Sequence, residues 1–246
     1  MPLRILSVLS FALVLGSGWA ATAPAPAPDS TTDPASDAAP PVMIIGFAGG
    51  FVRHDNMVHG PVQFAAQLRR DLPEGTVVQM FENRHGEQAR AEILRRLSAD
   101  HGGAPSAEEK QRARVVLYGH SWGATQAIVL ARELEKDGVP VLLTIQIDSV
   151  LKPGQTDDAT IPANVAAAVN FYQTTGFLHG QTEIRAADPA RTEIIGNYKY
   201  DYATHPLGCY ATYPWFDRVF MKAHTEIECD PSVWDKVEAL IRSKLP

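Results

Sequence analysis

The sequence is poor in the residues that bind metals, nucleotides and nucleic acids. Only two of its 246 residues are cysteines, and His54 and His59 lack a convincing third ligand, so no metal site is expected. The 18 glycines match neither G-x-G-x-x-G nor G-x-x-x-x-G-K-[ST], so no cofactor is implied. A formal charge of −6 argues against a nucleic-acid-binding surface.

Long apolar runs are also scarce. The run at the start of the chain, Ile5 to Leu15, is too short to span a bilayer convincingly. Because it follows Arg4 and precedes small residues, it is typical of a cleavable secretory signal. We expect a signal peptide over 1–20, with cleavage after Ala20 or Ala23. The protein would be secreted or periplasmic, without stable membrane insertion after cleavage; a retained anchor is the alternative.

The next segment, 21–41, consists almost entirely of Ala, Pro, Thr, Ser and Asp. Such a composition buries too little apolar surface to offset the entropy cost of ordering the chain. We therefore expect a disordered tether over 21–41 and one folded domain over 42–246.

The two cysteines, Cys209 and Cys229, form an even-numbered set that suits an oxidising compartment. Their spacing is compatible with a disulfide, which would contribute about 3 kcal/mol by closing a loop of roughly 20 residues. Two buried free thiols are the alternative, because a sequence cannot show the geometry of the pair.

Apolar or β-branched runs alternate with amphipathic segments over the rest of the chain. This alternation predicts an α/β fold, with a mostly parallel sheet covered by helices on both faces. We expect strands at 42–45, 76–81, 115–118, 139–147, 183–186 and 193–200. Helices are expected at 61–72, at 87–97 and directly after residue 121. A last helix is expected from 231 onwards, with Asp230 as its N-cap.

The segment from Ser149 to Gln181 leaves room for small insertions only, so we expect a small lid or none. Its apolar residues suit an acyl pocket and a helix core equally well: Phe171, Tyr172, Phe177 and Leu178.

Ser121 is the most informative residue, because it occupies the centre of Gly119-His120-Ser121-Trp122-Gly123. The apolar run 115–118 precedes this motif and a helical pattern follows it, which is the strand, sharp turn and helix context of a nucleophilic serine. The flanking glycines suit a turn too tight for Cβ atoms. A structural turn without chemistry is the alternative.

With this elbow, a glycine-rich first turn at 46–50, a later acid and a late histidine in that order, residues 42–246 resemble the α/β-hydrolase superfamily. The resemblance implies a triad of serine, acid and histidine. It assigns the base to His224, in the expected loop before the last helix, whereas the other histidines, His120 included, are expected to be structural.

Two aspartates are candidates for the triad acid. Asp148 ends the clear strand after the elbow helix, and Asp188 follows a weaker strand and precedes Pro189. We favour Asp148, because its strand is better defined and Asp-Pro pairs commonly form turns.

The resemblance also implies two backbone donors to the oxyanion that forms in acyl transfer. The N–H of Trp122 is one. The second is expected from the first turn, at Phe47 or else at Ala48, although the chain has Ile45-Gly46 where many members have His-Gly.

Together these features predict a serine hydrolase that cleaves a small-molecule or lipid carboxylic ester, or a thioester, through an acyl-enzyme on Ser121. A non-catalytic cell-envelope binding protein on the same fold is one alternative. An acyltransferase that uses the same triad is another.

Overall fold

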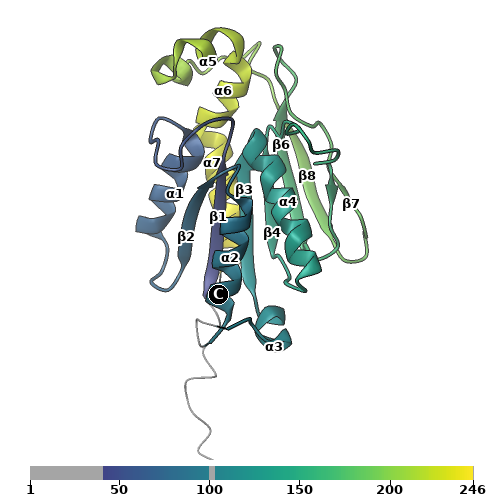
Figure 1. Ribbon diagram of the computed structural model, residues 1–246. Helices are drawn as coiled ribbons and strands as arrows, with labels where there is room; N and C mark the ends of the chain where they lie inside the picture. The colour runs from purple at the N-terminus through teal and green to yellow at the C-terminus, as the bar shows by residue number, and fades with distance from the viewer. Residues whose placement is uncertain (1–40, 100–102, 246) are drawn as a thin grey trace, which may run out of the picture. The chain divides into compact units, whose positions relative to one another are not determined.

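The computed structural model describes residues 41–99 and 103–245. The expected signal peptide and nearly all of the expected tether therefore lie outside the described residues. In the described part, a six-stranded parallel sheet has the order β2-β1-β3-β4-β6-β8 (Figure 1). Its strands are β1 (Val42–Ala48), β2 (Val77–Glu82), β3 (Arg114–His120), β4 (Leu143–Ile147), β6 (Ala167–Gln173) and β8 (Glu193–Tyr200). A separate pair joins β5 (Thr160–Ile161) to β7 (Arg185–Ala186).

Helices cover both faces of the sheet because the strands are apolar on both sides. Along β1, Ile44 faces a core shared with α1 (Gly60–Asp71) and α7 (Pro231–Arg242). Its neighbours Met43 and Ile45 face a second core, shared with α2 (Gly86–Leu97) and α4 (Trp122–Lys136). Alternation of side chains along a strand produces this division, and the expected α/β fold class is confirmed.

Short helices complete the described part. The helix α3 (Ala107–Gln111) begins with a capping box formed by Ser106 and Glu109. The 3-10 helix η2 (Cys209–Thr212) and the helices α5 (Trp215–Phe220) and α6 (Lys222–Cys229) precede α7. Figure 1 shows α5 and α6 beyond the end of the sheet at which the parallel strands finish. None of the helices in the described ranges is long and apolar enough to cross a membrane.

Several element boundaries differ from those expected. The strand β1 continues to Ala48, so Gly46 and Phe47 are strand residues and do not belong to a turn. The strand β4 begins only at Leu143, because the preceding segment contributes a single bridge from Val141 to Val165. The stretch with Phe171 and Tyr172, for which a helix core was one interpretation, is strand β6.

Candidate active site

Ser121 lies between β3 and α4 with φ 57° and ψ −128°, a backbone conformation that non-glycine residues rarely adopt. Its N–H donates to the carbonyl of Ile147 at 3.0 Å. A Cβ added to Gly119 would lie 2.3 Å from the carbonyl carbon of Gly123, and one added to Gly123 would lie 2.2 Å from the carbonyl oxygen of Phe47. Only glycine fits these two positions, because backbone occupies the space of a side chain.

Asp148 follows β4, is fully buried and has a positive φ of 43°. Its Oδ2 lies 2.7 Å from His224 Nδ1 and accepts a hydrogen bond from Gln173 Nε2 at 2.8 Å. Its Oδ1 accepts from the N–H groups of Gly180 at 2.8 Å and of Gln173 at 3.2 Å. Four donors around a buried carboxylate fix its orientation.

His224 lies within helix α6, and the expectation of a loop was wrong at this position. Its Nδ1 donates to Asp148, a contact that fixes the tautomer and leaves Nε2 as the basic nitrogen. Ser121 and His224 line the same cavity. Among the described residues, neither ring nitrogen of His224 forms a hydrogen bond with the Ser121 hydroxyl. In unliganded sites such bonds are often long and shorten when substrate binds.

Asp188 does not reach this site through any described contact. Its Oδ1 accepts from the N–H of Ala190 at 3.0 Å, and its carbonyl accepts from Arg191 and Thr192. This is the behaviour of an aspartate that shapes a turn before Pro189. The structure thus brings Asp148, not Asp188, to His224.

A cavity of about 530 Å³ opens beside Ser121. Much of its wall is apolar, which suits a hydrophobic ligand. The apolar lining comprises Phe51, Val52, Trp122, Val150, Leu178, Pro214, Phe216 and Met221. Of the earlier acyl-pocket candidates, Leu178 lines this cavity, whereas Phe171 lies in the core of the sheet and Phe177 is 96% exposed.

The two expected oxyanion donors have different surroundings. Trp122 is the first residue of α4, and N–H groups in the first turn of a helix have no intrahelical acceptor. Phe47 is buried inside β1, with its ring 6.1 Å from that of Phe81. The cavity wall begins at Gly49, where an added Cβ would lie 3.0 Å from the Cβ of Ser121.

The sequence interpretation gave His59 and His120 only structural roles and did not single out Glu228, yet all three line the cavity. His59 Nδ1 lies 2.9 Å from Glu228 Oε1, and His120 Nδ1 lies 3.6 Å from Glu228 Oε2. Sequence reasoning could not find this cluster, because 169 positions separate His59 from Glu228. It also missed Gln173, a polar residue at the end of a strand that was not predicted.

Burial and charge act in opposite directions on this cluster. Burial favours the neutral forms of His59 and Glu228. For His59, the hydrogen bond and the attraction to Glu228 outweigh burial and raise the pKa. For Glu228, the attraction to His120 and the hydrogen bond and attraction to His59 together outweigh burial and lower the pKa. For His120, burial dominates and lowers the pKa to about 3. These shifts favour a protonated His59 paired with an ionised Glu228, beside a neutral His120.

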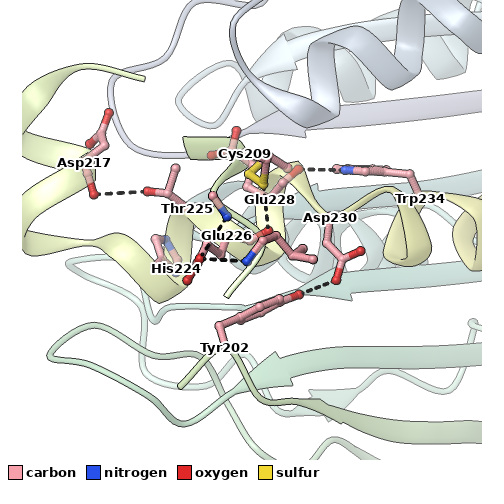
Figure 2. The surroundings of a disulfide bond; sticks show 12 residues. Tyr202, Cys209, Asp217, His224, Thr225, Glu226, Glu228, Asp230 and Trp234 are labelled. Atoms are coloured by element: carbon pink, nitrogen blue, oxygen red, sulfur yellow. Dashed lines mark hydrogen bonds between the residues drawn. A yellow bond between two sulfur atoms is a disulfide. The ribbon is translucent and has the colours of Figure 1, made fainter. Parts of the chain in front are cut away.

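Cys209 and Cys229 form a disulfide with a Cα–Cα distance of 6.0 Å, which confirms the expected pairing. Figure 2 shows the bond close to Glu228 and to the end of α6. The bond ties α6 to η2, and Glu226 adds to this link by accepting from the N–H of Leu207 at 3.2 Å.

Comparison with protein-family models gave no match for the sequence, and neither did comparison with curated proteins. Similar solved structures include RedJ with a polyethylene glycol molecule in its active site, at 12% identity and a TM-score of 0.39. The match covers 83% of this chain and 96% of RedJ. A cutinase-like protein from Cryptococcus sp. is 14% identical with a TM-score of 0.41, and the match covers 85% of this chain and 96% of that protein. A protein from Xanthomonas campestris pv. campestris, proposed to be a hydrolase of the α/β superfamily, is 16% identical with a TM-score of 0.34. The match covers 80% of this chain and 99% of that protein.

The fold is α/β-hydrolase-like. The chain has the parallel sheet between two helical layers and the strained serine between strand and helix that are typical of such a fold.

Proposed function

We propose that this protein is a serine hydrolase that cleaves a carboxylic ester, or a thioester, through an acyl-enzyme on Ser121. One observation carries the proposal. A serine with strained backbone angles shares a cavity with a histidine whose Nδ1 is bound to a buried aspartate. A merely structural turn needs neither the strain nor the buried pair.

In the proposed reaction, Ser121 Oγ attacks the carbonyl carbon of the ester while His224 Nε2 takes the hydroxyl proton. Asp148 stabilises the imidazolium and does not itself become protonated. The N–H of Trp122 and an N–H at the end of β1, from Phe47 or Ala48, donate to the oxyanion.

The attack gives a tetrahedral intermediate. Its collapse breaks the bond to the leaving oxygen or sulfur, which receives the proton from His224. Water then attacks the acyl-enzyme by the reverse sequence of proton transfers, which releases the carboxylic acid and restores Ser121.

The shape and lining of the cavity support an apolar acyl group. Phe51 and Phe216 line it and still expose 86% and 51% of their surfaces, so the apolar wall continues from the interior to the entrance. A bound acyl chain would cover both rings and gain free energy from their burial. The disulfide supports secretion or residence in the periplasm, because such bonds persist in oxidising compartments.

The decisive experiment is labelling with a fluorophosphonate, followed by intact-mass and peptide mass spectrometry. We expect one adduct per folded molecule, on Ser121, together with hydrolysis of p-nitrophenyl esters at rates that depend on acyl length. The Ser121→Ala variant should lose both, whereas the control Ser149→Ala should keep the adduct. Folded protein without an adduct would favour a non-catalytic binding protein instead.

A further inference from the structure

A second buried carboxylate lies behind the proposed base. Glu228 follows His224 by four residues on α6, so the two side chains lie on one face of the helix. The Glu228 side chain is 7% exposed, and each of its oxygens faces a histidine, Oε1 toward His59 and Oε2 toward His120. Burying a carboxylate is costly unless it is paired, and the pairing with His59 offsets that cost.

His120 connects this carboxylate to the base. Its Nε2 lies 3.2 Å from the carbonyl oxygen of His224, and the two rings lie 4.4 Å apart at an angle of 35°. A neutral His120 donates from Nε2 to that carbonyl and turns its unprotonated Nδ1 toward Glu228, at a separation too long for a hydrogen bond. His120 can therefore pack against His224 without placing a positive charge beside it.

The backbone of Glu228 is held as firmly as its side chain. Its carbonyl accepts a hydrogen bond from Trp234 Nε1 at 2.7 Å, as Figure 2 shows. A Cβ added to Gly60, which begins α1, would lie 2.0 Å from the same carbonyl oxygen. The following residue, Cys229, carries the disulfide. Contacts from α1, α7 and η2 thus converge on the end of α6, one turn after His224.

We propose that Glu228, held by His59 and facing His120, is a positioning residue for His224. Two consequences follow, and both rest on the proposed function. Glu228 fixes α6 so that Nδ1 of His224 faces Asp148, and its negative charge adds to that of Asp148 when His224 becomes an imidazolium. Acidic neighbours of His224 include Asp148, Asp217 and Glu228. Arg53 is a basic residue in the wall of the same cavity, and protonated His59 is the counter-ion of Glu228.

Two substitutions separate charge from position. Glu228→Gln keeps an acceptor for His59 but removes the negative charge, so the acid limb of the pH profile of kcat/KM should move to lower pH by about one unit. Glu228→Ala removes the contact as well, and kcat should fall about 100-fold with KM nearly unchanged. Glu226→Gln is the matched control, because Glu226 is buried on the same helix but accepts from the backbone of Leu207 and Gly208.

A substrate-free measurement keeps this inference separate from the proposed function. The low-field proton resonance of His224 Nδ1–H reports its bond to Asp148. It should persist in Glu226→Gln and be lost or broadened in Glu228→Ala. If Glu228→Ala keeps the resonance, or if Glu228→Gln matches Glu226→Gln in its pH profile, the positioning role is wrong. A wild-type protein without a phosphonate adduct would instead contradict the proposed function alone.

Discussion

Nδ1 of His224 lies 2.7 Å from Oδ2 of Asp148, although 76 positions separate the two residues in the chain. The contact joins the end of β4 to helix α6. Because Oδ2 also accepts from Gln173 and Oδ1 from two N–H groups, the carboxylate has little freedom to turn away from the imidazole.

Asp148→Asn should lower kcat steeply, by about 10⁴-fold if the precedent of serine proteases applies, because an amide favours the wrong tautomer of His224. Asp188→Asn should change kcat little, because an asparagine still accepts from Ala190 in the same turn. Kinetics and melting temperatures of both variants distinguish catalytic from folding defects. An inactive Asp188→Asn beside a near-normal Asp148→Asn would show that the acid is assigned wrongly.

Gln173→Met should lower kcat about tenfold while the protein still folds, because it removes the 2.8 Å hydrogen bond to Asp148 at nearly constant volume. Gln146→Met is the matched control. Gln146 is also buried in the sheet, but its Nε2 donates to the carbonyl of Asp158, away from the triad. Steady-state kinetics should show a loss in the first variant only; equal losses would mean that Gln173 acts through stability.

Gly123→Ala should destabilise the fold by about 3 kcal/mol, because the new Cβ would overlap the carbonyl of Phe47 on strand β1. Gly154→Ala should cost only about 1 kcal/mol. Its φ of 86° disfavours alanine, but no atom lies within 4 Å of the added Cβ. Urea unfolding of the two variants tests the comparison, and a stable Gly123→Ala would mean that β1 and α4 are less closely packed than described.

Replacing both cysteines by serine should lower the free energy of unfolding by about 3 kcal/mol, since the disulfide restricts a loop of roughly 20 residues in the unfolded chain. Activity should decline in step with the loss of order around α6, which carries His224. Urea unfolding with and without reductant measures the difference. Alkylation of two thiols in denatured, unreduced protein would argue against the bond.

The pair formed by His59 and Glu228 should make stability depend on pH in a defined window. The pKa of His59 is raised above its ordinary value of 6.5, so the contribution of the pair is lost as pH rises through that raised value. The pKa of Glu228 is lowered below 4.5, so the contribution is also lost as pH falls through that lowered value.

The difference in unfolding free energy between wild type and Glu228→Gln should therefore be largest between pH 4.5 and 6.5. Thermal or urea unfolding across this range measures it. For Glu226→Gln, the difference in unfolding free energy from wild type should not decline as pH rises above 6.5. A difference for Glu228→Gln that does not change with pH would mean that the pair carries no net charge interaction.

The local parts of the site could be predicted from the sequence. The motif around Ser121 specifies a tight turn because its glycines allow backbone contacts that a Cβ would block. Asp230 and Pro231 specify the start of the last helix, and the Asp230 side chain indeed accepts from the N–H of Ser232. These features depend on residues that are neighbours in the chain.

Other parts could not be predicted because their patterns are ambiguous. The strand β6 contains Asn170 and small alanines, and a strand buried on both faces lacks the alternation that identifies a half-exposed one. The segment that carries His224 reads as a loop, yet it forms a helix fixed by the disulfide and by the neighbouring helices.

By itself, the sequence determined the alternation of strands and helices that defines the fold class, the strained position of Ser121 and the choice of a strand-end aspartate, since each depends on local propensity and periodicity. Only the tertiary structure decided which groups meet. It brought Asp148 to His224, closed the bond between Cys209 and Cys229, and enclosed Glu228 between two histidines. Such contacts join residues far apart in the chain, and their energies depend on burial and distance, which exist only once the sheet and its helical layers have assembled.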